Sequence, residues 1–269
     1  LGFNIMVAMN HYETYVRKAV ETGADFIVSG AGLPLELPAM VSDTDIAIAP
    51  IVSSARATAL ILKYWEKKYH RYPDFIVIEG PEAGGHLGFS RKQLEEKMDY
   101  DMEISEILKL VRVYEKKAER KIPVAVGGGI CDKARAEHEF MLGADLIQVA
   151  SRFITTKECD ADSAYKDAYL KAQKEDIVLV SSPVGMPGRA IRNPFLEHVE
   201  KGEVQRPQKC FGCLKHCNPA EIPYCITEAL IHAVKGDTEN GLLFCGAQVF
   251  LANQIETVQD VMEDLLGGL

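Results

Sequence analysis

The 269-residue sequence lacks several features that would place it in a specialised class of protein. It has no apolar run near the 18 or so residues that a membrane-spanning helix needs, so we expect no membrane partner. Its net charge of −9 leaves no basic excess to neutralise phosphates, which argues against a nucleic-acid partner. No charged leader followed by a small-residue cleavage site is visible at the start. These absences favour a globular protein of the cytoplasm.

Two further patterns are missing. The seven cysteines are an odd number in a chain long enough to build its own core, so a disulfide scaffold is disfavoured and reduced thiols are expected. The glycines do not form the G-x-G-x-x-G pattern, which disfavours a Rossmann dinucleotide site.

Short apolar runs alternate with longer segments of helical period, a pattern typical of a parallel sheet with crossover helices. The predicted strands are residues 3–7, 26–28, 46–52, 75–78, 123–126 and 146–149. They are apolar throughout, as expected for strands buried on both faces. Ser53 or Ser54 can cap the helix after the third run, and another helix is predicted over 133–142, ending at Gly143.

Six strand–helix units fit two architectures. One is an open, doubly wound sheet, and the other is a TIM (β/α)₈ barrel that lacks its first two β/α units in this chain. After about residue 160 the alternation stops. We expect barrel units over 1–159, an α-rich cap with a cysteine-rich loop over 160–235, and a C-terminal helix over 236–269 that packs on the barrel. The helical period of this tail covers residues 242–266.

A run of three glycines, Gly127 to Gly129, follows the fifth strand and precedes a helix. Glycines at this place let a phosphate approach the backbone N–H groups. The next strand leads into residues 148–151, which offer small side chains and a hydroxyl. The loops after the last two strands of a barrel commonly form one phosphate site, although a tight turn is the alternative.

The stretch "EGPEAGGHLG", residues 79–88, follows the fourth strand. Gly84 and Gly85 can bring the backbone against a flat ligand without interference from a Cβ atom. His86 can exchange a proton near neutral pH, and the C-terminal end of a parallel strand is where active sites gather. A loop histidine with a structural hydrogen bond is the alternative, but the position favours His86 as a catalytic residue.

Together, "EGPEAGGHLG", "VAVGGGI" with the following "GADLIQVASRF", and "GMPGRAIRNPF" resemble the nitronate monooxygenase family. The related flavin-dependent enoyl-acyl-carrier-protein reductases look similar. The likeness covers most of residues 1–200 and implies a TIM barrel that holds FMN. In that family the run at 3–7 resembles the third strand, so the two strands before it would be absent from this chain.

The resemblance also implies roles for single residues. The cofactor-binding set that it implies is Asn4, Glu79, Gly84, Gly85, Gly128, Gly129, Gln148, Val149, Ala150 and Ser151. Gly84 and Gly85 would lie along the flavin ring, and Gly128 and Gly129 would bind its phosphate. Ala150 and Ser151 replace a glycine and a threonine, and the serine keeps the hydroxyl. Glu79 stands where many members have glutamine, and a carboxylate there would disfavour flavin reduction.

The activity implied is FMN-dependent oxidation of an alkyl nitronate or a related small anionic substrate. His86 would abstract or shuttle the substrate proton, and dioxygen would reoxidise the flavin. The alternative within enzymes is NAD(P)H-dependent reduction of an enoyl thioester, and the alternative of another class is a non-catalytic barrel that binds a metal or a partner. A homodimer is the assembly considered. Arg189, Arg192 and Asn193 would lie near the barrel mouth. Two roles are possible for them there, contact with the substrate or structural hydrogen bonds.

A second group of residues has the spacing C-x₂-C-x₃-C-x₇-C, formed by Cys210, Cys213, Cys217 and Cys225. Four thiolates can bind zinc or a [4Fe–4S] cluster. The spacing is not that of a standard zinc finger or ferredoxin, and reduced thiols in a loop are the alternative. The other three cysteines, Cys131, Cys159 and Cys245, are expected to be ordinary buried or loop residues.

Overall fold

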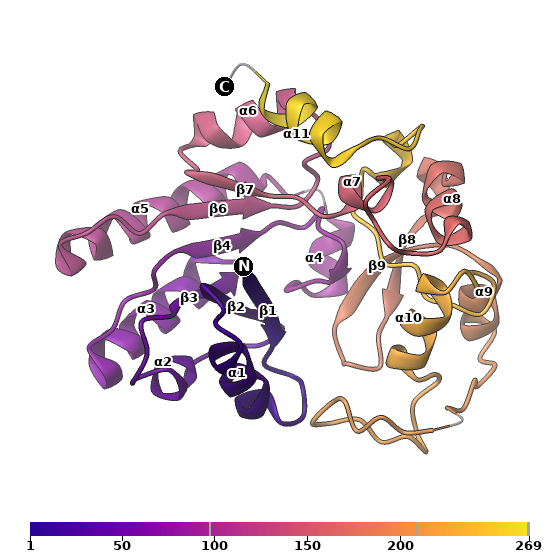
Figure 1. Ribbon diagram of the computed structural model, residues 1–269, viewed down its shortest axis with the longest axis horizontal. Helices are drawn as coiled ribbons and strands as arrows, with labels where there is room; N and C mark the ends of the chain where they lie inside the picture. The colour runs from indigo at the N-terminus through magenta and orange to yellow at the C-terminus, as the bar shows by residue number, and fades with distance from the viewer. Residues whose placement is uncertain (97, 208, 268–269) are drawn as a thin grey trace. The chain divides into compact units, whose positions relative to one another are not determined.

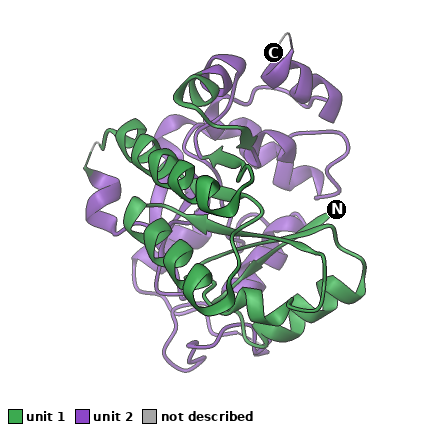
Figure 2. Cartoon of the chain, turned by 90° about the vertical axis from the view of Figure 1, so that its left-hand side faces the viewer, with its two compact units in different colours: residues 1–81, 96–127, 138–148 green, residues 82–95, 128–137, 149–269 purple. Residues whose placement is uncertain are grey.

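The computed structural model describes residues 1–96, 98–207 and 209–267, and the chain divides into two compact units (Figure 2). Unit 1 comprises residues 1–81, 96–127 and 138–148, and unit 2 comprises residues 82–95, 128–137 and 149–269. The three-part division predicted from the sequence, with boundaries at 159 and 235, stays a prediction.

Unit 1 is built on a six-stranded parallel sheet in which the strands follow chain order, β1-β2-β3-β4-β6-β7 (Figure 1). The strands are β1 Gly2–Met6, β2 Phe26–Gly30, β3 Ala47–Val52, β4 Ile76–Glu79, β6 Val124–Gly127 and β7 Leu146–Gln148. A doubly wound sheet reverses its strand order part-way, whereas consecutive units of a (β/α)₈ barrel do not. The doubly wound alternative is therefore wrong, and the barrel interpretation is confirmed.

The four central strands β2, β3, β4 and β6 are covered on both faces, which explains why the sequence predicts them as apolar runs. Val28, Ala49, Val77 and Ala125 form one buried cluster. On the opposite face, Ile27, Ile48 and Ile76 are among the residues with no exposed surface. Because neighbouring residues of a strand point to opposite faces, burial of both faces requires an uninterrupted apolar run.

The helices of unit 1 are α1 Tyr12–Glu21, α2 Leu37–Met40, α3 Ala55–Tyr69 and α5 Tyr100–Ala118, and α6 Lys133–Leu142 crosses the boundary between the units. Ser54 caps α3 by accepting a hydrogen bond from the Ala57 N–H at 3.2 Å. The bounds of α6 are the predicted ones, and Gly143 follows it with a φ of +107°. Among the described residues, no helix is both long and apolar enough to cross a bilayer.

Unit 2 contains a three-stranded antiparallel sheet that the sequence did not predict, in the order β5-β9-β8 (Figure 1). Its strands are β5 Gly85–His86, β8 Ile177–Ser181 and β9 Pro187–Ile191. The helices are α4 Arg91–Glu95, α7 Ser151–Ile154, α8 Ser163–Lys171, α9 Pro194–Glu200, α10 Ile226–Val234 and α11 Val258–Leu266, with 3₁₀ turns at Lys174–Asp176 and Val249–Leu251. The cap predicted as α-rich therefore also carries a β-hairpin.

The helix predicted over residues 242–266 is wrong in its first half, because the α-helix of this segment is α11, and a 3₁₀ turn at Val249–Leu251 lies before it. Residues 242–245 instead run beside β9. The Ile191 N–H donates to the Leu243 carbonyl at 2.9 Å, and the Cys245 N–H donates to the Arg189 carbonyl at 3.1 Å. Leu242, Leu243 and Cys245 are buried in this way, so their apolar side chains reflect strand-like pairing and not a helical face.

Candidate active site

The residues predicted to form the site are divided between the units. Asn4, Glu79 and Gln148 belong to unit 1, and the remaining ones belong to unit 2.

In unit 1, three residues form a row across the carboxyl ends of neighbouring strands. Glu79 on β4 pairs with Gly127 on β6, and Gly127 pairs with Gln148 on β7. Val77 and Ala125, two positions earlier on their strands, lie in the buried cluster, so the row continues that face of the sheet. The structure therefore brings a carboxyl and an amide side chain to either side of a glycine, at the end of the sheet where parallel α/β proteins bind ligands.

Glu79 is half-buried and held in place through its backbone. The Tyr100 hydroxyl donates to the carbonyl oxygens of Glu79 and Ser53, each at 3.1 Å. Burial raises the pKa of the Glu79 carboxyl to about 7, because desolvation disfavours the charged form. Near pH 7 a large fraction of Glu79 therefore keeps its proton and is neutral, as a glutamine would be. This reduces the conflict expected between a carboxylate and a reduced flavin.

Asn4 lies outside this row. It is exposed, and it pairs with Val28, two residues before β2 ends at Gly30. The strand pairing places Glu79 and Gln148 together and leaves Asn4 at another level of the same sheet.

In unit 2, His86 is fixed by contacts from three segments of the chain. Its backbone pairs with Gly188 of β9, and its Nε2 atom lies 2.8 Å from the Ser182 hydroxyl oxygen. The Phe244 ring packs against the imidazole at 5.0 Å between centroids and an angle of 70°. Burial lowers the pKa of His86, because desolvation disfavours the charged imidazolium. A neutral, oriented imidazole is a suitable proton acceptor at neutral pH.

Ser182 is itself well ordered by the hairpin. It is buried, its hydroxyl oxygen accepts the Val184 N–H at 3.2 Å, and its own N–H donates to the Met186 carbonyl at 3.2 Å. The sequence did not single out Ser182 or Phe244, because they lie about 100 and 160 residues after His86. The only available signal was the density of turn formers in "SSPVGMPG".

The two glycines before His86 have different reasons to be glycine. A Cβ atom on Gly84 would come within 2.6 Å of the Cys245 carbonyl carbon, so close packing against the backbone requires this glycine. Gly85 has a φ of +70° and open space around its Cβ position, with the Phe244 ring at 4.0 Å. Gly85 is therefore the position of the pair that leaves backbone accessible to a flat ligand.

Gly128 and Gly129 have φ values of +111° and +73°, which side chains other than glycine rarely adopt. The Glu82 side chain lies directly over the Cβ position of Gly129, and Gln248 donates a 3.4 Å hydrogen bond to its carboxylate. The sequence did not single out Glu82 as part of this loop. Its negative charge beside the predicted phosphate position is the one feature of the glycine loop that opposes an anion.

Residues 149–151 follow β7. Val149 is half-buried, Ala150 is exposed, and Ser151 begins the one-turn helix α7. The Ser151 hydroxyl accepts the Gly246 N–H at 2.9 Å. The next residue, Arg152, pairs with Glu256 at 3.0 Å and Asp264 at 2.7 Å. The Ser151 hydroxyl can thus still donate its own hydrogen, whereas the charge of Arg152 is paired with Glu256 and Asp264.

The three polar residues of the "GRAIRN" segment have structural partners. Arg189 donates to the Ala83 carbonyl at 2.5 Å, and Arg192 pairs with Glu200 on the surface at 3.1 Å. Asn193 caps α9 by accepting the Leu196 N–H at 3.0 Å. These contacts favour the structural alternative for all three residues.

All seven cysteines are free thiols. Of the four that were considered as metal ligands, Cys210 is exposed, Cys213 and Cys217 are half-buried, and Cys225 is buried. Burial and the neighbouring thiols Cys213, Cys210 and Cys225 raise the pKa of Cys217. Within the described ranges, no three His, Cys, Asp or Glu side chains are grouped so that they could hold a metal ion.

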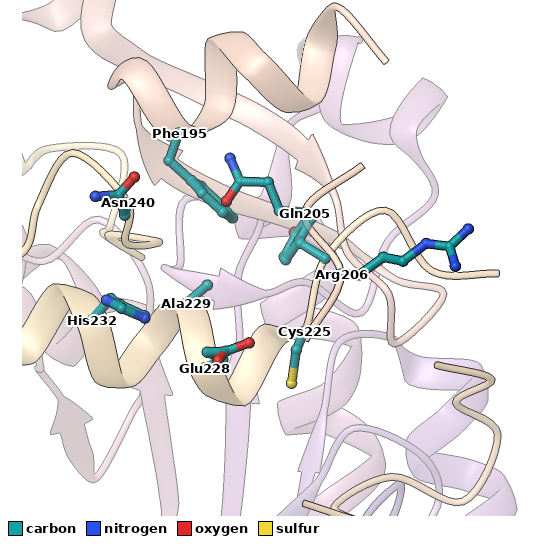
Figure 3. Close-up of a pocket in the computed structure, with 9 residues that line it drawn as sticks. Phe195, Gln205, Arg206, Cys225, Glu228, Ala229, His232 and Asn240 are labelled. Atoms are coloured by element: carbon teal, nitrogen blue, oxygen red, sulfur yellow. The ribbon is translucent and has the colours of Figure 1, made fainter. Parts of the chain in front are cut away.

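A cavity of about 220 Å³ lies in unit 2 beside α10 (Figure 3). Phe195 and Tyr224 provide its apolar lining, and Gln205, Glu228 and His232 provide polar groups. Among the residues that line it, Cys225 is the one that the sequence had singled out.

The model of the family described as nitronate monooxygenase matches residues 1–268. The chain belongs to this family. A probable nitronate monooxygenase of Staphylococcus aureus strain Newman is 31% identical over 134 residues, which are 50% of this chain and 36% of that protein. The match thus spans about a third of the length of this curated relative.

Solved structures extend the likeness to nearly the whole chain. FabK from Thermotoga maritima has a TM-score of 0.76 and 25% identity, and the match covers 98% of this chain and 74% of that one. The nitroalkane oxidase from Streptomyces ansochromogenes has a TM-score of 0.72 and 17% identity, with 98% and 80% covered. The fold predicted from the sequence is thus confirmed, and the family is one of oxidoreductases.

Proposed function

We propose that this chain belongs to an FMN-dependent oxidoreductase that oxidises alkyl nitronates with dioxygen. Family membership supports the reaction class. The observation within the molecule that carries the proposal is the His86–Ser182 pair, 2.8 Å apart, in which half-buried His86 lies on the short strand β5.

The residues present fit a flavin at most of the predicted positions. Gly85, Gly128 and Gly129 have positive φ values, so their backbone presents no side chain to a flat ring or a phosphate. The Glu79 carboxyl, whose pKa is raised to about 7, and the Gln148 amide are suited to hydrogen bonds with the polar atoms of a flavin ring. The Glu82 carboxylate over Gly129 is the exception, and a bound phosphate requires that this side chain turn away.

In unit 2, Gly128, Gly129 and Ser151 are our candidates for holding the phosphate, and Gly85 is our candidate for contact with the ring. In unit 1, the candidates for ring contacts are Glu79 and Gln148. Bound FMN would supply the electron transfer between the substrate and dioxygen. The His86 imidazole, neutral in its buried position, takes up or returns the substrate proton at a ring nitrogen. Ser182 keeps the ring oriented through its contact with Nε2, so that the other nitrogen has a defined direction.

The substrate would be a small anion. A neutral His86 carries no charge that would form an ion pair with it. A reducing compartment such as the cytosol suits a chain whose seven cysteines are all free. A homodimer and NAD(P)H remain proposals for the partner and the alternative electron donor. For Cys210, Cys213, Cys217 and Cys225, zinc and a [4Fe–4S] cluster are the two candidates that four thiolates can hold.

The test uses the full-length protein, purified and supplied with FMN. We expect the two visible absorption bands of bound oxidised flavin, together with oxygen uptake that depends on an alkyl nitronate. Reduction of an enoyl thioester, the alternative enzyme reaction, would instead give thioester-dependent loss of NADH. A colourless protein that binds no FMN would support the non-catalytic alternative.

A further inference from the structure

The Phe244 ring occupies the space beside the imidazole of the candidate base His86. The two rings pack at 5.0 Å between centroids. A Cβ atom on Gly188, the β9 residue that pairs with His86, would come within 2.9 Å of the Phe244 ring. The Cβ position of Gly85 lies at ordinary contact distance from the same ring, 4.0 Å. Because the Ser182 hydroxyl contacts Nε2 of the imidazole, Phe244 and Ser182 together set its direction.

The backbone of Phe244 has a carbonyl group that the neighbouring strand does not satisfy. Phe244 forms an isolated antiparallel bridge with a residue of β9. Before it, the Leu243 carbonyl accepts the Ile191 N–H, and after it, the Cys245 N–H donates to the Arg189 carbonyl. In an antiparallel pair, such hydrogen-bonded positions alternate with positions whose N–H and C=O groups point away from the partner. The Phe244 carbonyl therefore points away from β9 and needs another donor.

Tyr169 on α8 provides this donor (Figure 1). Its side chain is fully buried, and its hydroxyl donates to the Phe244 carbonyl at 2.6 Å. One turn earlier on α8, the Tyr165 hydroxyl oxygen lies 2.7 Å from that of Tyr169. A tyrosine hydroxyl has one hydrogen, and Tyr169 gives its own to the carbonyl, so Tyr165 is the donor in this pair. Burial raises the pKa of both tyrosines, so both keep their hydrogens at neutral pH.

The hydroxyl of Tyr169 has a role separate from that of its ring. The ring lies in a buried cluster that includes Leu243 and Val249, and a phenylalanine ring would fill the same space. A buried hydroxyl carries a desolvation cost that only a hydrogen bond offsets, and this one is bonded to the Phe244 backbone. Because the carbonyl and the ring belong to the same residue, the bond that fixes the Phe244 backbone also limits the movement of its ring.

We propose that Tyr169 is a positioning residue for His86 and acts through Phe244. The Tyr169 hydroxyl fixes the Phe244 backbone, and the Phe244 ring then limits the movement of the imidazole and helps to exclude water from it. Tyr165 orients the Tyr169 hydroxyl. This inference rests on the proposed function, because it takes His86 as the base, and it names the group that keeps this base neutral and in place.

The experiment titrates the His86 imidazole by NMR in the full-length protein, without substrate, and compares Tyr169→Phe with the native protein. His86→Ala, which lacks the signal, assigns it. Burial lowers the pKa of His86, so a less constrained Phe244 ring that admits water should move this pKa up toward the ordinary value of about 6.5. The titratable groups beside His86, Arg189 on β9 and Cys245 next to Phe244, are unchanged in this variant. An unaltered His86 titration in Tyr169→Phe would overturn the proposal.

The matched control is Tyr12→Phe. Tyr12 is a buried tyrosine of unit 1, and its hydroxyl oxygen lies 2.7 Å from that of Ser29. This variant also loses a buried hydrogen bond but keeps the contacts of Phe244, so its His86 titration should match that of the native protein. An equal shift in Tyr12→Phe and Tyr169→Phe would show a general loosening of the fold and contradict the proposal.

A second variant keeps the test available if Tyr169→Phe does not fold. Tyr165→Phe removes only the outer hydrogen bond of the tyrosine pair, so it should shift the His86 titration in the same direction and by less. An unaltered titration in Tyr165→Phe would then count against the proposal.

Activity with FMN and an alkyl nitronate gives a separate measurement. Tyr169→Phe should lower kcat about fivefold with little change in KM, as expected for loss of one hydrogen bond that orients the base. Nitronate oxidation by a protein whose His86 titration does not respond to Tyr169→Phe would overturn this inference alone. A shifted titration in a protein that does not oxidise nitronates would refute the proposed function and leave the positioning of His86 by Tyr169 supported.

Discussion

Glu79 at the end of β4 and His86 at the end of β5 are opposite kinds of titratable group in similar surroundings. Burial raises the pKa of Glu79 to about 7, and burial lowers the pKa of His86. Both shifts favour the uncharged form, because removal from water penalises charges of either sign. The two differ in how they are held. Glu79 is placed by the ladder of a parallel sheet, whereas His86 depends on its side-chain partners Ser182 and Phe244.

Because of this difference, Glu79 and His86 should respond to different changes. The charge on Glu79 should change with pH near neutrality while its position stays fixed. His86 should stay neutral down to the ordinary histidine pKa of about 6.5, while its orientation should respond to changes in the hairpin. Each of the following substitutions tests one side of the comparison.

The largest effect is expected for His86→Ala. Loss of a positioned general base should lower kcat/KM for an alkyl nitronate by about 10²–10⁴-fold, while FMN binding and the fold remain. Steady-state oxygen uptake measures the rate, and flavin absorbance measures the cofactor. The control is His198→Ala, which removes an exposed histidine that lies 3.3 Å from Glu203. Equal rates in the two variants would rule out a catalytic role for His86.

The next effect concerns the backbone that carries His86. Gly84→Ala should lower the free energy of unfolding by about 3 kcal/mol, because the new Cβ atom would meet the Cys245 backbone. Gly85→Ala has space for its methyl group, and its cost comes only from the positive φ. We therefore expect its free energy of unfolding to fall by about 1 kcal/mol. Urea denaturation of both variants gives the comparison. A greater loss from Gly85→Ala would show that the two glycines have been assigned the wrong roles.

Glu79→Gln should change how stability depends on pH. The folded-state pKa of Glu79, about 7, is above its ordinary value of 4.5. The stabilisation that comes from protonated Glu79 is therefore complete below the ordinary pKa, and it is lost as the pH rises through about 7. The variant should lack this loss. At pH 8 its free energy of unfolding should therefore exceed that of the native protein by on the order of 2 kcal/mol. Denaturation at pH 5 and pH 8 tests this.

The matched control for Glu79→Gln is Glu106→Gln, an exposed carboxylate that pairs with Lys109 on α5. Its pH dependence should follow that of the native protein. If Glu79→Gln shows the native slope as well, then burial does not keep Glu79 protonated.

The smallest effect is expected for Ser182→Ala. A hydrogen bond of this type contributes about 1 kcal/mol, so kcat should fall roughly fivefold with little change in KM. Ser182→Thr, which keeps the hydroxyl, should restore most of the rate. A fall in KM alone, or no rescue by threonine, would indicate that Ser182 does not orient His86.

The sequence predicts the parallel sheet well because its four central strands are buried on both faces and leave uninterrupted apolar runs. The bounds of α6 and the cap of α3 follow from local chemistry in the same way. The pairing of β5 with β9 has no local signal, since residues 85–86 and 188–189 meet only in the folded chain. For the same reason Ser182 was missed, and the apolar residues 242–245 were assigned to a helix although they pair with β9.

For the candidate site, the types of residue could be predicted and their surroundings could not. The position of His86 after a strand follows from "EGPEAGGHLG", but its neutral state depends on burial by distant segments. The pattern of glycines likewise does not reveal that Gly84 is packed against Cys245 or that Glu82 covers Gly129. Such contacts are set by tertiary packing and leave no periodic trace in the chain.

The central claim is tested most directly by mixing FMN-loaded full-length protein with an alkyl nitronate in the absence of oxygen. The account predicts that the visible flavin bands bleach with the nitronate, that they return when oxygen is admitted, and that His86→Ala bleaches far more slowly. Flavin bands that persist with the nitronate but bleach with NADH, and then return on addition of an enoyl thioester, would contradict it.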